Sequence, residues 1–250
     1  MKFDFSQGNI LIFAGAGISQ ESGLSTFRDN GGLWDKYDVM EICNFTKFLQ
    51  HTLDMTEGRQ DIFDFYNMRK REIQKAQPNF AHYKIAEWQA QFGDRVKVVT
   101  SNIDDLFEKA GCTNVVHIHG ETEHMKCAVC DHRWHIGDGE FNADEQCPKC
   151  GSEFTKPNVV FFGEGAPEYA TMADVFNPKR RTAQDHLFYV GSSMQVVGPA
   201  MVFGAPHRNW SLGTKVLIDA NAHDLFKGFP YFDRVDQNTA VASFGKIEIV

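Results

Sequence analysis

The sequence lacks the features that mark membrane-spanning, secreted and nucleic-acid-binding proteins. Its longest early apolar stretch, residues 10–18, is far shorter than the roughly 20 residues that a membrane-spanning helix needs, and no signal peptide or lipidation motif is evident. Basic residues are in the minority, with 25 Lys and Arg against 33 Asp and Glu, and the formal net charge is −8. Because phosphates attract basic surfaces, we expect neither nucleic acid nor a membrane as a partner.

Cysteine is too scarce for a disulfide scaffold, because only six occur in 250 residues. Four of them, Cys127, Cys130, Cys147 and Cys150, form the pattern C-x2-C-x16-C-x2-C, which is typical of a four-thiolate zinc ribbon. A closed set of thiolates leaves no open coordination position, so we expect one structural Zn²⁺ in a reducing, cytoplasmic protein. A redox CxxC pair is the alternative, but neither pair follows a thioredoxin-like strand-to-helix pattern.

What the chain does contain is a series of short apolar runs that end in glycine or small polar residues. These runs cover residues 9–13, 95–99, 186–190 and 215–218. They are typical of buried parallel strands, and residues 61–77 and 81–92 between them could form helices. The pattern predicts an α/β fold with a Rossmann-like, doubly wound parallel sheet whose strand ends open at one ligand-binding edge. We expect this domain to cover residues 1–125 and 158–250, with residues 126–157 as an inserted zinc-binding module.

A glycine-rich turn follows the first apolar run, where Gly15, Ala16 and Gly17 lead to Ser19. Glycines let the backbone approach a pyrophosphate closely, while amides at the start of the following helix face its charge. The third glycine of the usual dinucleotide fingerprint is missing, because position 20 is Gln. Taken alone, these residues fit a tight strand-to-helix turn without a ligand equally well.

Polar residues follow the second run, and a histidine lies a little further along the chain. Asn102 and Asp104 could orient a sugar and a carboxamide at the strand end, and His119 could titrate in the range that proton transfer needs. A lone histidine is more often structural. We favour a functional one here because a histidine, a carboxylate and a glycine-rich turn are predicted at the same sheet edge.

Several motifs occur along the chain in a fixed order. They are Gly-Ala-Gly-Ile-Ser at 15–19, Ser-Gly-Leu-Ser-Thr-Phe-Arg at 22–28, Asn-Ile-Asp at 102–104, His-Gly at 119–120, the two CxxC pairs, Val-Val-Phe-Phe-Gly-Glu at 159–164, Gly-Ser-Ser at 191–193 and Val-Gly-Pro-Ala at 197–200. Over about residues 8–221 the chain therefore resembles the sirtuin family. The resemblance implies an enzyme that consumes NAD to remove acyl groups from lysine in proteins, releasing nicotinamide and O-acyl-ADP-ribose.

The resemblance also implies roles for individual residues. His119 would be the general base, and Asn102 and Asp104 would orient the ribose and the nicotinamide. The expected NAD-binding set adds to these two Gly15, Ala16, Gly17, Ser19, Phe27, Arg28, Trp34, Ser101, Ile103, Gly191, Ser192, Ser193, Asp219, Ala220 and Asn221. An acylated peptide would lie as an added strand along Phe162, Gly163, Glu164 and Val197.

Four positions depart from the residues usual in the family. Ser101 stands in place of Gln, Phe107 of His, Ser192 of Thr and Asp219 of Asn. Ser192 keeps a hydroxyl, and Asp219 can accept hydrogen bonds from a ribose. Ser101 and Phe107 are less conservative, which leaves a slower or altered reaction open. An NAD-consuming hydrolase or ADP-ribosyltransferase on the same scaffold is therefore the first rival function, and a non-catalytic zinc-ribbon adaptor is the second.

One further pair bears on the acyl group. Tyr66 and Arg69 lie one turn apart in a predicted helix. In one sirtuin subgroup, which includes bacterial members, a Tyr-x-x-Arg pair recognises an acyl chain that ends in a carboxylate. The resemblance therefore implies succinyl and malonyl substrates besides acetyl. Because Lys70 and Arg71 follow directly, a solvated basic helix face is the alternative.

Overall fold

The computed structural model describes residues 1–26, 37–203, 212–222 and 232–250. The chain divides into two compact units, each built from more than one stretch of sequence. Unit 1 consists of Met1–Leu24, Gln77–Ile118 and Pro167–Val250, and unit 2 consists of Ser25–Ala76 and His119–Ala166. The insert expected at residues 126–157 lies in unit 2, together with residues that the sequence assigns to the larger domain.

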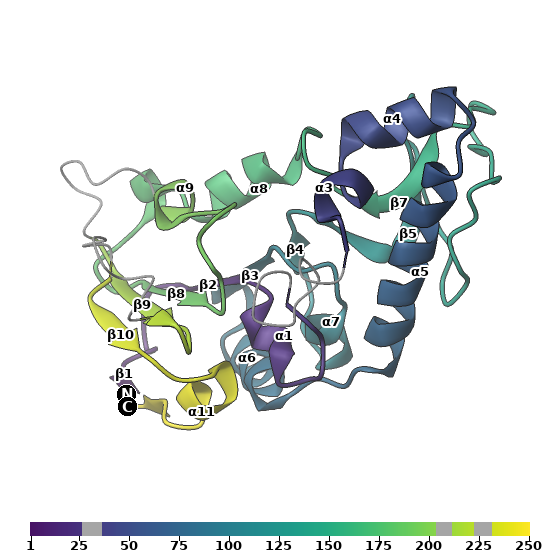
Figure 1. Ribbon diagram of the computed structural model, residues 1–250. Coiled ribbons are helices and arrows are strands. Elements are labelled where there is room, and N and C mark those ends of the chain that lie inside the picture. Colours follow the sequence, from purple (N-terminus) through teal and green to yellow (C-terminus); the bar gives the residue numbers. More distant parts are fainter. Residues whose placement is uncertain (27–36, 204–211, 223–231) are drawn as a thin grey trace. The chain divides into compact units, whose positions relative to one another are not determined.

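A six-stranded parallel sheet forms the centre of unit 1, in the order β10-β9-β8-β2-β3-β4 (Figure 1). Its strands are β2 (Ile10–Ala14), β3 (Val96–Thr100), β4 (Val116–His117), β8 (His186–Val190), β9 (Thr214–Ile218) and β10 (Arg234–Asp236). Four of them match the predicted apolar runs, which confirms the doubly wound sheet. The chain proceeds from β2 through β3 to β4 on one side and from β8 to β10 on the other, so the switch point lies at the ends of β2 and β8.

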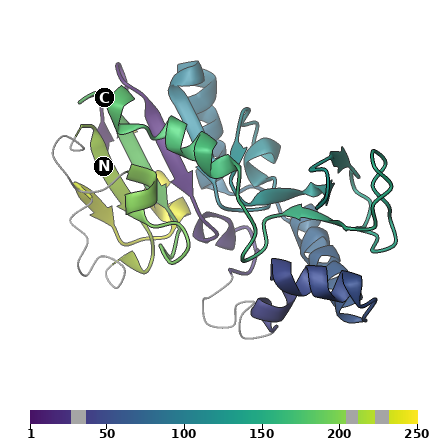
Figure 2. The same ribbon diagram turned by 90° about the horizontal axis from the view of Figure 1, so that it is seen from above.

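Alternate residues of β2 enter two separate apolar clusters. Ile10 and Ile12 belong to the cluster that contains residues of α6 (Phe80–Phe92) and α11 (Ala240–Phe244). Leu11 and Phe13 belong to the cluster that contains residues of α8 (Glu168–Val175) and α9 (Pro199–Phe203). Since successive strand side chains point to opposite faces, helices cover both faces of the sheet, as Figures 1 and 2 show.

Short elements complete unit 1. They are α1 (Gly17–Gln20), α7 (Leu106–Lys109), the 3-10 helices η1 (Gly93–Arg95) and η2 (Pro178–Arg180), and the paired terminal strands β1 (Lys2–Phe3) and β11 (Glu248–Ile249). In the described part of the chain, no helix combines the length and the apolarity that a membrane crossing requires.

Unit 2 contains a three-stranded antiparallel sheet in the order β6-β5-β7. Its elements are β5 (Gly120–Cys127), β6 (Arg133–His135), β7 (Thr155–Val159), α3 (Val39–Ile42), α4 (Phe45–Leu53) and α5 (Gly58–Lys75). Asn67 of α5 exchanges two hydrogen bonds with the Phe141 backbone, at 3.0 and 2.7 Å, and Lys70 donates to the Gly137 carbonyl at 2.6 Å. These bonds explain why α5 belongs with the insert, because the periodicity of a helix does not show which distant loop its polar side chains bind.

Candidate active site

Two glycine turns meet at the switch point of the unit 1 sheet. The Gly17 amide donates to the Gly191 carbonyl at 2.7 Å, and the Gly15 amide donates to the Val190 carbonyl at 2.9 Å. A Cβ atom at Gly15 would lie 2.7 Å from the Cβ of Ser192, and one at Gly17 would lie 2.8 Å from the Cα of Gly191. Only glycine permits this approach, so the turns at 15–17 and 191–193 come together as the sequence predicts.

Asn102 joins the end of β3 to the first glycine turn. Its Nδ2 atom lies 3.2 Å from both the Gly15 carbonyl oxygen and the Ser19 hydroxyl, and its backbone amide donates to the Thr100 hydroxyl at 3.0 Å. The preceding Ser101 amide donates to the Ala14 carbonyl at 3.0 Å. Since Asn102 is buried, these bonds fix its amide at the ligand-binding edge of the sheet.

Asp104 lies two residues further along and is also buried. Burial raises the pKa of its carboxyl, and hydrogen bonds from Ser19 and from the Leu106 amide oppose this rise only in part. Ser19 therefore contacts both Asn102 and Asp104, which makes it the residue that links the two predicted orienting side chains.

The end of β9 supplies the third predicted nucleotide segment, Asp219 to Asn221. The Gly191 amide donates to the Ile218 carbonyl at 2.9 Å, which places this segment beside the second glycine turn. The carboxylate of Asp219 accepts from the Asn221 amide at 2.8 Å. Burial raises the pKa of the neighbouring Tyr189, and Asp219 adds to the rise.

Val197, predicted to hold the peptide, is buried in the apolar cluster of α8 and α9. The Tyr189 hydroxyl donates to its carbonyl and lies 3.1 Å from the Ser192 hydroxyl. A side chain of β8 therefore fixes the main chain at Val197.

His119 begins the second stretch of unit 2, where its carbonyl accepts from the Val160 amide at 2.9 Å. Gly120 follows with φ +78, and a Cβ atom there would lie 1.9 Å from the Asn158 carbonyl oxygen. The glycine of the His-Gly motif is thus required by the close approach of β5 and β7. Phe27, Arg28 and Trp34 lie outside the described residues.

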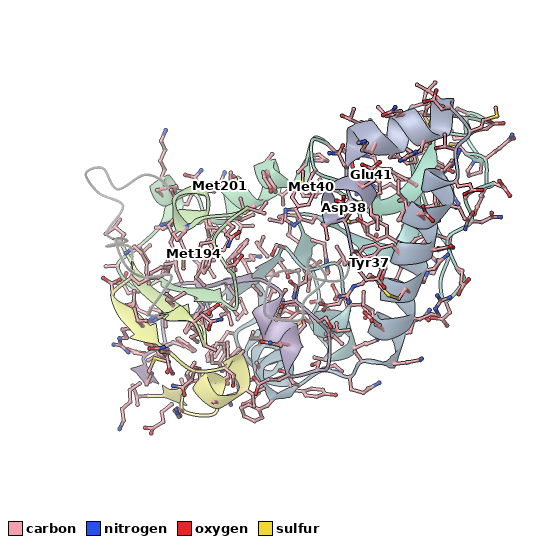
Figure 3. All side chains as sticks on the ribbon, in the orientation of Figure 1. Tyr37, Asp38, Met40, Glu41, Met194 and Met201 are labelled. Carbon is pink, nitrogen blue, oxygen red and sulfur yellow. The ribbon has the colours of Figure 1, made fainter. Side chains whose placement is uncertain are left out.

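Tyr66 and Arg69 are both buried on α5, which excludes the solvated-face alternative. The Tyr66 ring stacks on Phe161 with centroids 5.4 Å apart, and its hydroxyl bonds to the Cys43 thiol. Burial raises the pKa of Tyr66 well above its usual value, so the hydroxyl remains a neutral donor. The Tyr37 hydroxyl donates at 3.0 Å to the sulfur of Met68, which is on the same helix. Figure 3 labels Tyr37, which precedes α3 in the chain.

The Arg69 guanidinium is held at two of its three nitrogens. Nη1 pairs with Glu72, and Nη2 lies 3.4 Å from the Ser25 carbonyl oxygen. Its buried Nε atom has no hydrogen-bond acceptor among the residues that the structure describes. An unsatisfied buried donor is costly, so this nitrogen is suited to an anionic ligand.

Glu164, also expected to contact the peptide, turns its carboxylate inward. One oxygen lies 2.9 Å from Nζ of the fully buried Lys156 and accepts from the Phe161 amide at 3.0 Å. The other lies 3.5 Å from Nζ of Lys126. Burial lowers the pKa of Lys156 to about 8, although Glu164 opposes this shift. Glu164 therefore fixes the shape of its own loop.

The adjacent Phe162 is fixed through its main chain. Its amide donates to the Cys43 carbonyl at 2.7 Å, and its carbonyl accepts from the Phe45 amide at 2.9 Å. Gly163 follows in the left-handed region, with φ +82. The predicted peptide-docking segment is thus tied to the start of α4.

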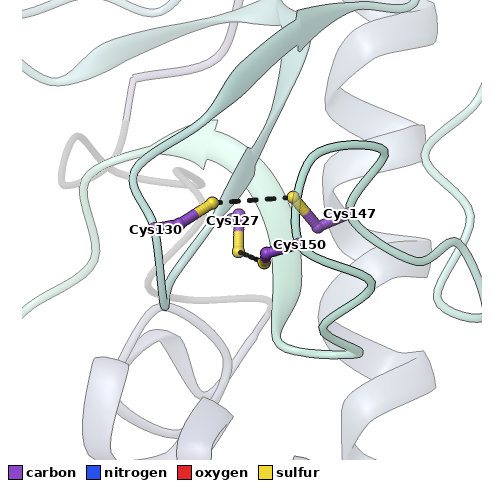
Figure 4. A group of neighbouring side chains, drawn as sticks. All are labelled: Cys127, Cys130, Cys147 and Cys150. Atoms are coloured by element: carbon purple, nitrogen blue, oxygen red, sulfur yellow. Dashed lines mark hydrogen bonds between the residues drawn. The ribbon is translucent and has the colours of Figure 1, made fainter.

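The four paired cysteines converge in unit 2 (Figure 4). Their sulfur atoms all lie within 4.8 Å of one another, with 3.6 Å between Cys127 and Cys150 and 3.7 Å between Cys130 and Cys147. A tetrahedral zinc site with Zn–S bonds of about 2.3 Å has sulfur atoms about 3.8 Å apart. The donor set therefore fits one zinc ion.

The two CxxC turns have the same backbone design. The residue after each second cysteine, Asp131 or Gly151, has a positive φ. Its amide donates to the carbonyl of the first cysteine of the pair, at 3.1 Å for Cys127 and 2.8 Å for Cys147. Each turn is closed by its own backbone, so the two thiols of a pair point to the same centre.

Comparisons with known proteins agree with these features. The model of the Sir2 family matches residues 15–198. An NAD-dependent protein deacylase of Campylobacter jejuni is 46% identical over 164 residues, which cover 66% of this chain and 67% of that protein. One of Helicobacter hepaticus is 36% identical over 223 residues, covering 83% and 84%. A solved Sir2 homologue in complex with NAD has a TM-score of 0.75 at 27% identity, and the match covers 94% of this chain and 86% of that one.

The sequence did not single out Lys156 or Glu72, although each contacts a predicted site residue. Cys43, expected to be a buried free thiol, is one. A lysine or glutamate in a polar stretch is ordinarily solvated, so its type carries no signal of burial. Only the tertiary structure shows these partners.

Proposed function

The chain belongs to the Sir2 family and is an NAD-dependent protein deacylase, and from this premise we propose how its residues perform the reaction. The observation that carries the proposal is the meeting of the two glycine turns with Asn102 at the switch point of the parallel sheet. This is the edge at which α/β sheets bind ligands. The turns would hold the pyrophosphate, with Ser192 and Asp219 beside them.

The orienting groups act on the sugar and the nicotinamide. Asn102 presents a fixed, buried amide, and Asp104 presents a carboxyl whose raised pKa makes it easier to protonate than an exposed one. We assign the general base to His119, which would take a proton from a ribose hydroxyl. NAD is consumed as a co-substrate, and it supplies the ribose carbon to which the acyl oxygen is transferred.

The substrate is an acylated lysine within a protein or peptide. We propose that the peptide adds as a strand to the segment Phe162 to Glu164 and also contacts Val197, as the family membership implies. Internal hydrogen bonds give each segment a defined conformation before the peptide binds. Main-chain pairing of this kind depends little on the sequence of the partner. The four-cysteine site would hold zinc away from the chemistry, since four thiolates close its coordination.

We propose that this enzyme removes succinyl or malonyl groups as well as acetyl. Arg69 is buried and has an unsatisfied Nε, and Tyr66 lies one helical turn away. Glu72 already occupies Nη1, so an acyl carboxylate would bind at Nε and Nη2. The Tyr66 hydroxyl would have to turn from Cys43 to join that contact.

The test is a panel of acetyl, malonyl and succinyl peptides incubated with NAD and the purified protein. We expect nicotinamide release to require an acyl peptide and to be fastest, or equally fast, with the anionic acyl groups. NAD loss without peptide would instead support the hydrolase or ADP-ribosyltransferase alternative.

A further inference from the structure

His117 lies at the end of β4 in unit 1 and contacts two other segments of that unit. Its Nδ1 atom lies 3.0 Å from the carbonyl oxygen of Asn102. Its Nε2 atom lies 3.0 Å from a carboxylate oxygen of Glu108, on α7. The His117 side chain is 11% exposed and that of Glu108 is 42% exposed, so the contact with Asn102 is partly shielded from water and the contact with Glu108 is open to it.

The two partners determine the protonation state of the ring. A carbonyl oxygen and an ionised carboxylate can only accept hydrogen bonds. A neutral imidazole has one N–H, whereas the imidazolium has two. Both contacts can therefore be hydrogen bonds only when His117 is protonated.

The surrounding charges support the protonated ring. Burial alone would lower the pKa of His117, but the hydrogen bond and charge of Glu108 outweigh it, with help from the Asn102 carbonyl and the Asp104 carboxylate, so the pKa is raised. Glu108 acts from α7 and Asp104 from the segment after β3.

We propose that protonated His117, held between Glu108 and the Asn102 carbonyl, is a positioning residue for the NAD-binding segment 101–104. This inference rests on the roles proposed above for Asn102 and Asp104. The Asn102 amide and side-chain Nδ2 are already bonded to Thr100, Gly15 and Ser19, and His117 holds the main-chain carbonyl. Removing that bond frees the peptide plane between Asn102 and its neighbour.

The sign of the pH effect follows from the raised pKa. Both hydrogen bonds are present below the pKa of folded His117. Above it the one remaining N–H stays on Nε2, beside the Glu108 carboxylate, so the bond to the Asn102 carbonyl is the one that is lost. Affinity for NAD should therefore fall at alkaline pH. Affinity for the acyl peptide should not follow, because the two hydrogen-bond partners of His117, Asn102 and Glu108, are not assigned to the peptide.

The experiment combines nuclear magnetic resonance of the histidine rings with NAD-binding measurements between pH 5.5 and 9, a range spanning the ordinary histidine pKa of about 6.5. His117 is assigned by comparison with His117→Gln. We expect its pKa to lie above the ordinary value, and Glu108→Gln to lower it by about one unit or more. In that variant the new side-chain amide can donate to Nε2 of the neutral ring, which leaves the Nδ1–H on the Asn102 carbonyl, so the alkaline loss of NAD affinity should be abolished.

A matched control is Glu123→Gln, which alters an exposed Glu–His pair with His135 in unit 2 and should leave the NAD profile unchanged. A general structural effect of Glu108→Gln would also change its melting temperature and its KM for acyl peptide. Both are therefore measured beside the NAD affinity. A His117 pKa at or below its ordinary value, or an NAD profile unaltered by Glu108→Gln, would overturn the inference. Failure of the proposed function gives a different result from failure of this inference. In that case the unaltered protein binds no NAD, although His117 still titrates.

Discussion

At the residue scale, loss of the His119 side chain should impair the deacylation reaction and leave NAD binding nearly unchanged. We predict that His119→Ala lowers the turnover of acyl peptide by about 10² to 10⁴, the usual contribution of a general base. The Kd for NAD should change little, because the base acts after the co-substrate has bound. Steady-state kinetics and calorimetric titration with NAD measure the two effects. Turnover close to that of the unaltered protein would exclude His119 as the base.

Arg69 should determine the preference among acyl groups. A hydrogen bond to a charged group contributes about 1.5 to 3 kcal/mol, so Arg69→Met should lower kcat/KM for succinyl peptide about 10- to 100-fold relative to acetyl peptide. Arg71→Met is the matched control, because Arg71 is on the same helix but half exposed and paired with Glu140. Equal losses on both peptides would show that Arg69 supports the fold of α5 rather than the acyl group.

At the scale of elements, the two CxxC turns should depend on their metal. We predict one zinc ion per chain by elemental analysis, and loss of this zinc with a lower soluble yield in Cys147→Ala. Zinc binding and local folding are one event in such sites. Cys112→Ala is the control, since Cys112 is a buried free thiol of unit 1. Stoichiometric zinc in Cys147→Ala would contradict the assignment.

The Lys156–Glu164 pair should support the peptide-docking segment. Breaking a buried ion pair costs about 3 to 5 kcal/mol where it leaves the other charge uncompensated, and less here because Nζ of Lys126 lies 3.5 Å from the second oxygen of Glu164. We predict that Lys156→Met raises the KM for acyl peptide about tenfold or more, while Lys156→Arg restores it and the KM for NAD stays constant in both. Lys84→Met, which removes a partly exposed pair with Glu87, should change neither. A parallel rise in both KM values would indicate general unfolding.

The strands show how much of the fold can be predicted from the sequence alone. The runs that became β2, β3, β8 and β9 are apolar and end in small residues, so they were predictable. The short strands β4 and β10 were not, because two or three residues carry no period. The membership of α5 in unit 2 was also hidden, since it depends on Asn67 and Lys70 binding a loop about 70 residues away.

The same limit applies to the site. The glycines, Asn102 and the cysteines were predictable because their chemistry requires those residue types at those spacings. The internal partners of Arg69 and Glu164 were not, because pairing between charged side chains depends on tertiary distance. The sequence predicted that Glu164 contacts the peptide, whereas in the structure its carboxylate faces inward.

At the scale of the whole molecule, the assigned chemistry is divided between the units. Unit 1 contains the glycine turns, Asn102 and Asp104, whereas unit 2 contains His119, Arg69 and the cysteine site. The proposed reaction therefore uses residues from both units. NAD consumption and lysine deacylation should be coupled, with neither proceeding alone.

The most direct test of this account is mass spectrometry of the products formed from NAD and an acyl-lysine peptide. We predict equal amounts of nicotinamide, deacylated peptide and O-acyl-ADP-ribose, with none of them formed when either substrate is omitted. Release of free carboxylic acid without O-acyl-ADP-ribose, or conversion of NAD in the absence of peptide, would contradict the account.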